Sequence, residues 1–308
     1  MGNDRGFFQD NTEEEKKNIN CVSKRWLIID SSHLIYKASF VLNYLSYDEV
    51  KTGVIFGFLN SFISIVSKFG TRHICFCWDS KKSKRKEVFP SYKEKRRKKV
   101  LTDREKYERK EMFRQADILY KEVLPYLGIK NNFKIEGLEA DDIIANLVKQ
   151  LDGEKIIVTS DDDMLQLLDN ETFIYNTNKK TSFTVNDFEK KYGILSLQWA
   201  DVKALAGCKS DDVPGISGIG EKTAIQFLKG ELKPASKKYG SIVSKEGKDT
   251  YEFMYRLVKL PFEKVELSVD EKPIVIDMNN FVDICDRFNF TYFLKKDNYL
   301  KWKQNLSA

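Results

Sequence analysis

Acidic residues stand at the ends of three short apolar runs in this sequence. The runs are residues 25–30, 73–79 and 155–161, and their last residues are Asp30, Asp79 and Asp161. Runs this short and this rich in Ile, Val and aromatic residues are typical of buried strands in a parallel sheet. Ligands of such sheets bind beyond the carboxyl ends of the strands, where the three aspartates would lie. The sequence therefore predicts an acidic pocket at one edge of a sheet.

A second set of acids is expected to join this pocket. Glu139, Asp141 and Asp142 open a segment in which apolar residues recur at helical spacing. On a helix Glu139 and Asp142 share a face, and Asp141 near the helix start can lean toward the same place. Further along, alternation would put Asp161 and Asp163 on one side of the chain.

So many like charges predict a cation. A single aspartate that ends a strand is more often the N-cap of the next helix than a metal ligand. Three such strands together with the acids at 139–142 are harder to explain by capping alone. The carboxylates would repel one another unless Mg²⁺ or Mn²⁺ bound among them. The predicted chemistry is metal-dependent hydrolysis of a phosphodiester.

Basic residues are concentrated between Lys81 and Lys99. This segment holds eleven basic and two acidic residues, a net charge of +9, whereas the whole chain carries +6. The remainder of the chain is therefore net acidic. A basic segment beside an acidic pocket suits a polyanion held by its phosphates, and the plainer alternative is a solvated charged face.

The rest of the composition excludes several classes of protein. No apolar stretch approaches the roughly 20 residues of a membrane span, and no secretory apolar region is present near residue 1. The five cysteines form no CxxC pair, which favours a reducing cytoplasm over a disulfide framework.

The pattern along the chain divides it into three parts. Residues 1–24 are expected to be a loose tail, 25–195 an α/β core and 196–308 a helical lobe. Within the core, the charged segment 80–114 is either a solvated helical pair standing off the body or a flexible loop. Helices are expected over 31–44, 53–66, 116–127, 185–192, 197–206, 221–229 and within 253–293.

A glycine-rich stretch, residues 207–224, follows within the helical lobe. Pro214 and Gly215 make a turn, and Gly218 and Gly220 permit close approach of a partner before a helix begins. Free N–H groups at such a helix start can bind a phosphate, and Lys222 adds positive charge. Alone this is weak evidence for phosphate binding, but it gains weight beside the acids and the basic segment.

These segments resemble the 5′ nuclease family, which comprises flap endonucleases, phage 5′–3′ exonucleases and the N-terminal domain of bacterial DNA polymerase I. The resemblance runs from about Leu27 to Phe293. The matching pieces are residues 29–38, 52–58, 78–79, 89–96, 136–142, 160–167 and 207–224. The resemblance implies a central, mostly parallel sheet flanked by helices, a helical arch at about 80–114, and a helix-3-turn-helix lobe with its hairpin at 207–224.

The family's site residues carry over to matching positions. The resemblance implies that the first metal is held by Asp30, Asp79, Glu139 and Asp141, with Asp142 close by, and the second by Asp161, Asp163 and Asp211. It implies that Lys37, Lys93 and Arg96 act on the scissile phosphate. Contacts to DNA would come from Arg85, Tyr92, Arg97, Gly215, Ser217, Gly218, Gly220 and Lys222. Two Mg²⁺ ions, replaceable by Mn²⁺, and a K⁺ ion at the hairpin are the implied cofactors.

One position departs from the family pattern. Cys208 stands where the family usually has the first aspartate of Gly-Asp-x-x-Asp, although Asp211 remains. A thiolate is a poor ligand for Mg²⁺. We therefore expect weaker binding of the second metal, with a need for more Mg²⁺ or a preference for Mn²⁺, which aspartate at position 208 would reverse.

The expected activity is that of a structure-specific 5′ nuclease, both exonuclease and flap endonuclease, with a two-metal mechanism in replication or repair. Expected partners are branched or 5′-ended DNA, an RNA–DNA hybrid, and a single-strand-binding protein or polymerase. The chain would be a monomer in the cytoplasm of a bacterial or phage-infected cell, without a membrane. Two alternatives are a catalytically weakened relative that binds branched DNA, and an RNA-cleaving protein like the PIN ribonucleases.

Overall fold

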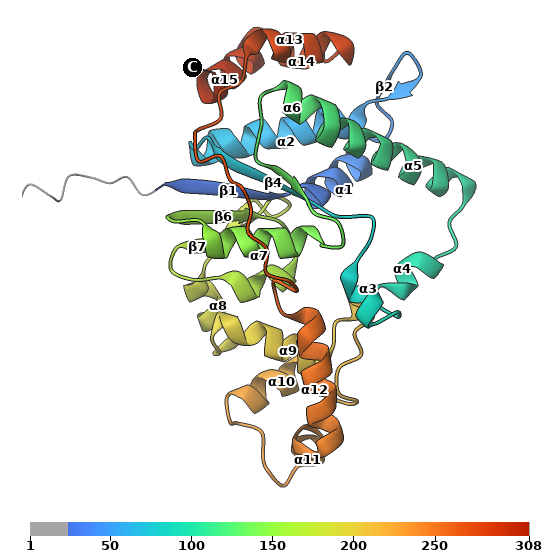
Figure 1. Ribbon diagram of the computed structural model, residues 1–308, viewed down its shortest axis with the longest axis vertical. Coiled ribbons are helices and arrows are strands. Elements are labelled where there is room, and N and C mark those ends of the chain that lie inside the picture. The colour runs from blue at the N-terminus through green and yellow to red at the C-terminus, as the bar shows by residue number, and fades with distance from the viewer. Residues whose placement is uncertain (1–23, 308) are drawn as a thin grey trace, which may run out of the picture.

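The computed structural model describes residues 24–307, so the expected tail lies almost wholly outside the described residues. A six-stranded sheet runs through the middle of the chain in the order β5-β4-β1-β6-β7-β8 (Figure 1). Neighbours from β5 to β7 pair in parallel, and only β8 pairs antiparallel. The strands are β1 (Arg25–Asp30), β4 (His73–Trp78), β5 (Asn132–Lys134), β6 (Glu154–Val158), β7 (Thr172–Asn176) and β8 (Thr181–Phe183).

The register of the sheet brings the predicted acids together. β1 lies between β4 and β6, with Asp30 opposite Cys77 and Ile29 opposite Val158. The three strands therefore end at the same edge, and their following residues share it. The expected mostly parallel sheet flanked by helices is confirmed.

Alternation along β1 builds a core on each face of the sheet. Leu27 and Ile29 belong to one apolar cluster and Trp26 and Ile28 to the other, because successive side chains of a strand point to opposite faces. Helices α1 (Ser31–Leu42), α2 (Gly53–Phe69) and α5 (Asp103–Ile118) lie on the first face, and α7 (Ala140–Gln150) lies on the second. A small antiparallel pair, β2 (Ser46–Tyr47) and β3 (Val50–Lys51), joins α1 to α2.

The arch, residues 80–114, is helical. It contains α3 (Lys84–Val88), α4 (Glu94–Lys98) and most of α5. In Figure 1 α3 and α4 stand away from the sheet at the right. The polar α5 is anchored at its C-terminal half, where Gln115 Oε1 accepts hydrogen bonds from Val54 N (2.8 Å) and Ile55 N (3.3 Å) at the start of α2. The helix continues through a π-helical turn, η2 (Leu119–Val123), into α6 (Leu124–Tyr126).

Short helices form a lobe below the sheet in Figure 1. They pack around α9, where Trp199 and Phe188 meet edge to face, with 5.6 Å between ring centroids, and are both fully buried. The elements are η3 (Asp162–Leu167), α8 (Val185–Tyr192), η4 (Ser196–Gln198), α9 (Trp199–Ala206), η5 (Lys209–Asp211), α10 (Glu221–Leu228), α11 (Lys237–Val243) and α12 (Lys245–Val258).

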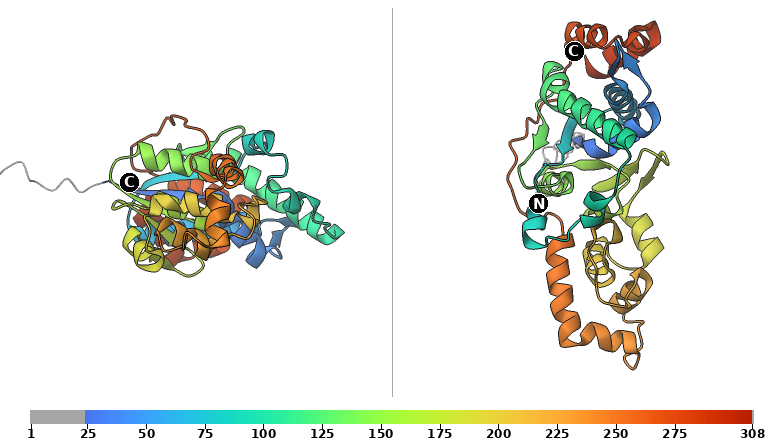
Figure 2. Two further views of the ribbon diagram at one scale, coloured as in Figure 1. Left: turned by 90° about the horizontal axis from the view of Figure 1, so that it is seen from below. Right: turned by 90° about the vertical axis from the view of Figure 1, so that its right-hand side faces the viewer.

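The last part of the chain corrects the expected domain division. After α12, residues 259–277 contain no helix and lead back to the far end of the molecule (Figure 2). There α13 (Met278–Arg287), α14 (Thr291–Leu294) and α15 (Lys296–Leu306) share a core with α2. Phe62 of α2 contacts Trp302, which stacks on Phe281 at 4.4 Å between ring centroids. The lobe expected over 196–308 therefore ends near residue 258. Periodicity shows that a helix has an apolar face, but not which partner that face meets.

None of the helices in the described part of the chain is long and apolar enough to cross a membrane.

Candidate active site

The first strand-ending acids are held both as caps and by neighbouring loops. Asp30 is the N-cap of α1 and accepts a hydrogen bond from His33 N (3.0 Å), while Thr159 Oγ1 donates to its second oxygen (2.9 Å). Asp79 accepts from Ser32 Oγ (2.6 Å) and from Ala140 N at the start of α7 (2.9 Å). Capping and ligand roles, which the sequence posed as alternatives, are compatible, since the caps fix these carboxylates at one edge of the sheet.

Like charges crowd this edge. Burial raises the pKa of Asp30 to about 7, and the charges of Asp79 and Asp161 add to the effect. Burial also raises the pKa of Asp141, together with the charges of Asp161 and Asp30. The hydrogen bonds of Asp79 to Ser32 and Ala140, and of Asp30 to Thr159, bring together the ends of β1, β4 and β6 and the start of α7. A cation here would favour the ionised form of all these acids. We call Asp30, Asp79, Glu139 and Asp141 the first site.

Glu139 differs from its neighbours because it is already paired with basic groups. Its carboxylate lies 2.8 Å from Lys93 Nζ and accepts a hydrogen bond from Tyr92 OH (2.9 Å). Burial opposes its ionisation, but Lys93 and Arg85 outweigh that cost and hold the pKa of Glu139 below its usual range. The arch thus supplies counter-charge to the first site.

Asp142 and Arg85 correct two expectations. Asp142 is fully buried and accepts two hydrogen bonds from Arg85, at 2.6 and 2.8 Å, and a third from Phe262 N (2.8 Å). Arg85, predicted to contact DNA, is only 3% exposed. Glu139 is the N-cap of α7, and its N–H donates to the Asp142 carboxylate (3.2 Å), so the two acids are neighbours and both lie near Arg85. The ion pair of Arg85 and Asp142 fastens α3 to α7.

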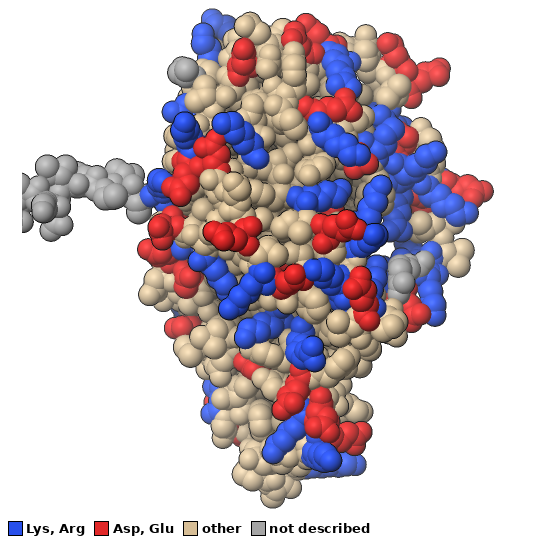
Figure 3. Space-filling model, viewed as in Figure 1, with Lys and Arg blue, Asp and Glu red and all other residues tan. Residues whose placement is uncertain are grey.

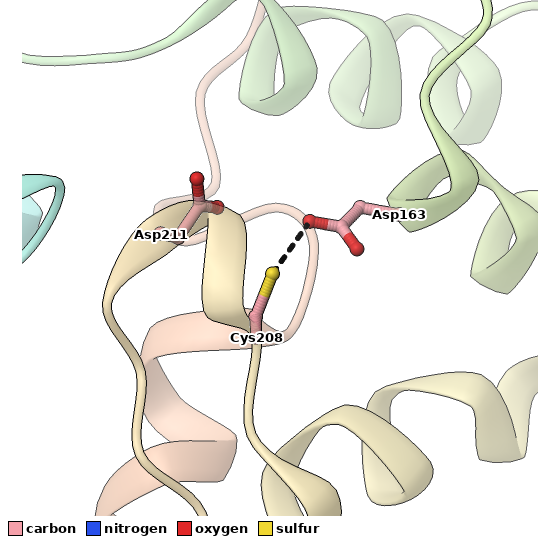
Figure 4. A group of neighbouring side chains, drawn as sticks. All are labelled: Asp163, Cys208 and Asp211. Carbon is pink, nitrogen blue, oxygen red and sulfur yellow. Dashed lines mark hydrogen bonds between the residues drawn. The ribbon is translucent and has the colours of Figure 1, made fainter. Parts of the chain in front are cut away.

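A second group of possible ligands lies between η3 and the hairpin (residues 207–224). Figure 4 shows Asp163, Cys208 and Asp211 directed toward one another. Each offers a ligand atom within 4.8 Å of the other two, and Cys208 Sγ lies 4.0 Å from Asp163 Oδ2. We call these three residues the second site. Asp161 lies beside them, because it accepts a hydrogen bond from Asp163 N (2.8 Å).

Basic groups pair with both carboxylates of the second site. Lys203 Nζ of α9 lies 2.8 Å from Asp163, and Arg96 Nη2 lies 3.0 Å from Asp211. Arg96 of the arch therefore lies next to an acid of the second site.

The part of the arch that lies nearest the acids, residues 92–95, is joined to the hairpin. Lys93 N donates to Asp211 O (2.8 Å), and Lys95 N donates to the Asp212 carboxylate (2.8 Å). Tyr92, expected to contact DNA, is 3% exposed and packs with Cys208 and Val213. Its hydroxyl reaches Glu139, so in this structure Tyr92 connects the two sites and is covered. The side chain of Arg97 lies outside the described residues.

Lys37 lies on α1, in the helix that Asp30 begins. Its ammonium donates to Thr177 O (2.9 Å), and partial burial followed by the charge of Lys180 lowers its pKa. Thr177 Oγ1 also lies 2.8 Å from His33 Nε2, whose other ring nitrogen lies 3.0 Å from Ser160 Oγ. Burial, then Lys37, lowers the pKa of His33 to about 4, so His33 is neutral at pH 7 and holds these loops around Asp30.

The hairpin combines a rigid base with an open tip. Gly215 has φ of +66°, and a Cβ there would lie 2.2 Å from Gly207 N. Gly218 and Gly220, by contrast, have no atom within 4 Å of such a Cβ. Ser217, Gly218, Gly220 and Lys222 are exposed, whereas the intervening Ile216 and Ile219 are buried. The tip therefore offers backbone and Lys222 to a partner at the start of α10, which has no side-chain cap.

Comparison with known proteins identifies the family. A family model described as the 5′-3′ exonuclease N-terminal resolvase-like domain matches residues 25–193. A 5′-3′ exonuclease of Buchnera aphidicola is 32% identical over 246 residues, 78% of this chain and 77% of that protein. The chain belongs to the 5′-3′ exonuclease family. A 5′-3′ exonuclease of Aquifex aeolicus is 30% identical over 294 residues, 89% of this chain and 95% of that protein.

The fold of this exonuclease family member is also found among solved structures. A crystal structure of the T5 D15 protein co-crystallised with metal ions has a TM-score of 0.67 at 20% identity, covering 78% of this chain and 90% of that one. The family predicted from the motifs, and the fold predicted with it, are confirmed.

Two residues of the exonuclease site were missed from sequence. Lys203 pairs with Asp163, and the available signal was its place four residues before Gly207, on the helix that leads into the hairpin. His33 was given no role, although it stands three residues after Asp30, where its N–H can donate to that capping carboxylate. His33 lies on α1, which begins at Asp30, and Lys203 lies on α9, which ends just before the hairpin.

Proposed function

We propose that this chain is a structure-specific 5′ nuclease that hydrolyses 5′-ended or branched DNA, including RNA-primed ends, with two divalent cations. The observation that carries the proposal is the meeting of acids from β1, β4, β6 and α7 beneath a basic arch joined to a phosphate-binding type of hairpin. Neither the acids nor the arch alone would distinguish a nuclease from a generic cation-binding or polyanion-binding protein.

The residues of the first site fit a hard cation. Asp30, Asp79, Glu139 and Asp141 offer only oxygen donors, which Mg²⁺ prefers and Mn²⁺ accepts. Burial, and after it the charge of neighbouring acids, raises the pKa of Asp30 and Asp141, and a bound cation would offset both effects. When bound, divalent cations would stabilise charge on the scissile phosphate and activate water.

The basic residues hold and orient the substrate. Lys93 and Arg96 lie against Glu139 and Asp211, so a phosphate bound over the acids would be within reach of both. Lys37 would add positive charge from α1, the helix that Asp30 caps. In this assignment the carboxylates are metal ligands, and the basic side chains of Lys37, Lys93 and Arg96 bind phosphate. No side chain of this set serves as a general base.

The hairpin would grip the duplex backbone. Its exposed glycines and the free N–H groups of α10 are suited to phosphate oxygens, and a K⁺ ion bound by hairpin carbonyls would add to the grip. Contacts of this kind read the position of the backbone and not the base sequence. We therefore propose that specificity comes from the shape of the junction and from its free 5′ end.

A 5′-labelled DNA flap tests the proposal. Incubation with Mg²⁺ should give a short labelled product, and the same reaction with chelator should give none. A blunt duplex of the same sequence serves as the control for structure specificity, and an RNA flap of identical geometry tests the RNA-cleaving alternative. Failure to cut any DNA flap across a range of Mg²⁺ and Mn²⁺ concentrations would refute the proposal.

The arch makes a prediction about salt. Among described side chains of its basic segment, Lys81, Lys82, Lys95, Arg96, Lys98 and Lys99 are exposed (Figure 3, right edge). Replacing Lys98 and Lys99 by Ser should weaken flap binding and make the slope of log affinity against log salt shallower, by roughly 0.7 per lost contact with single-stranded phosphate. Fluorescence anisotropy at several salt concentrations measures this slope.

The matched control is Lys303→Ser on α15, an exposed lysine at the far end of the molecule. This substitution removes one positive charge and leaves the arch unchanged. The slope of log affinity against log salt for this variant should therefore equal that of the unaltered protein. Equal slopes for the arch variant and the control would show that the arch lysines do not contact phosphate.

A further inference from the structure

The second site contains a sulfur donor on a firmly placed backbone. Cys208 follows the last turn of α9, and its N–H and C=O both pair with Val213 across the base of the hairpin (2.8 and 3.0 Å). Its side chain is covered, at 5% exposure, and Sγ lies 2.9 Å from Ser210 Oγ. The residue packs at the edge of a small apolar cluster with Tyr92 and Val213, and its sulfur lies beside Asp163 and Asp211.

The two carboxylates of this site are not free to attract a hard cation. Asp163 has Lys203 at 2.8 Å, and Asp211 has Arg96 at 3.0 Å. An incoming Mg²⁺ would have to compete with both basic groups, and it would gain almost nothing from a sulfur ligand. Lys203 lies near enough to act on the sulfur as well, but it is paired with Asp163, and among the described residues no salt bridge involves Cys208 itself. A cation that bonds strongly to thiolate would gain binding free energy from the sulfur of Cys208, whereas Mg²⁺ would not.

The spacing of the donors suits such a cation. A tetrahedral ion with one sulfur and two oxygen ligands places sulfur and oxygen about 3.6 Å apart, from bond lengths of about 2.3 and 2.1 Å. Cys208 Sγ and Asp163 Oδ2 are 4.0 Å apart, and all three ligand atoms lie within 4.8 Å of one another. Small rotations of side chains would close the site. Three protein ligands also leave a fourth position open, as in zinc sites that take part in catalysis.

We propose that the second cation position of this chain takes a thiophilic divalent ion of the zinc class, Zn²⁺, Cd²⁺ or Co²⁺, in preference to Mg²⁺, with Cys208 as a thiolate ligand. On binding, the sulfur–metal bond forms and the thiol proton passes to the solvent. This rests on the proposed function in that a second cation serves the same acid cluster, and it makes the enzyme a mixed-metal nuclease, with an oxygen-only first site and a sulfur-containing second site.

Cobalt provides a direct measure of the sulfur ligand. Titration of the full chain with Co²⁺ should produce a near-ultraviolet thiolate-to-cobalt charge-transfer band that saturates at one equivalent. The band should disappear in Cys208→Ser and persist in Cys285→Ser, a buried cysteine in the core next to α2. Unchanged circular dichroism of the two variants without metal would show that both are folded. A band that survives Cys208→Ser would overturn the assignment.

Competition then ranks the cations. Stoichiometric Zn²⁺ or Cd²⁺ should abolish the cobalt band, whereas Mg²⁺ in large excess should leave it in place. Cys208→Ser should weaken Cd²⁺ binding, measured by calorimetry, by more than about tenfold, since even outer-shell partners of a metal contribute that much. Cys208→Asp should reverse the order and bind Mg²⁺ more tightly than the unaltered chain does. Displacement of Co²⁺ by Mg²⁺ at similar concentrations would contradict the proposed preference.

These readouts separate the two proposals. If the cobalt band appears but no flap is cut, the nuclease assignment fails and the sulfur-containing site stands. If flaps are cut with Mg²⁺ and no cobalt band appears, the nuclease assignment stands and the thiolate site is refuted.

Discussion

Asp79→Asn should abolish flap cleavage while flap binding stays within about twofold of the unaltered protein. The change removes a negative charge from the first site but keeps the size of the side chain and one oxygen acceptor for Ser32 or Ala140. A loss of rate of at least about a hundredfold is expected, the scale on which single preorganised electrostatic groups act in catalysis. Asp161→Asn should have the same effect, because its charge belongs to the same cluster. Cleavage of a labelled flap and anisotropy of the same flap measure the two quantities.

Asp152→Asn is the matched control. Asp152 is exposed in the loop before β6, at the opposite edge of the sheet, so it loses the same charge far from the acids. Its rate should be unchanged. Normal turnover by Asp79→Asn and Asp161→Asn would point to the weakened, binding-only relative, in which the acids no longer support chemistry.

Asp142→Asn and Arg85→Met should each lower the free energy of unfolding by about 3–5 kcal/mol, the cost of leaving one member of a buried ion pair without its partner. The side chain of Asp142 is fully covered and that of Arg85 is 4% exposed, so water cannot replace the lost partner. The double variant Arg85→Met with Asp142→Leu should be more stable than either single variant, because no uncompensated charge remains. Urea unfolding followed by circular dichroism measures all three.

The exposed pair of Glu94 and Lys98 on α4 provides the comparison. Its N–O distance is also short, 2.8 Å, but the lysine side chain is 75% exposed. Lys98→Ala should therefore cost no more than about 1 kcal/mol. If Asp142→Asn lowered the free energy of unfolding by as little, Asp142 would not be held by Arg85 in solution. Its role as a metal ligand would then have to be reconsidered.

Much of the core could be predicted because short-range patterns determine it. Runs of Leu and Ile ending in Asp30, Asp79 and Asp161 indicate parallel strands, and parallel strands bring their ends to one edge whatever the loops between them do. Family motifs added Lys93 and Arg96, which lie against the acids as the resemblance implied.

The errors arose where a long-range partner decides the outcome. Arg85 has the composition of a surface residue, and only the fold shows that it meets Asp142 across 57 positions. The Phe-rich C-terminal segment has an obvious apolar face, but the sequence does not reveal that α2 covers it. Helical spacing put Asp142 beside Glu139, but it could not show that the buried guanidinium of Arg85 occupies the Asp142 carboxylate.

The hydrogen bonds between residues 92–95 of the arch and the hairpin have a mechanical consequence. Lys93 N and Lys95 N are both tied to the Asp211–Asp212 turn, so these segments must move as a unit. In the proposed function, a duplex bound at the glycine tip would therefore be linked to the ammonium of Lys93 through a short path of covalent and hydrogen bonds. This link would set the distance from the bound backbone to the reacting phosphate, and we expect it to restrict cleavage to one position along the duplex.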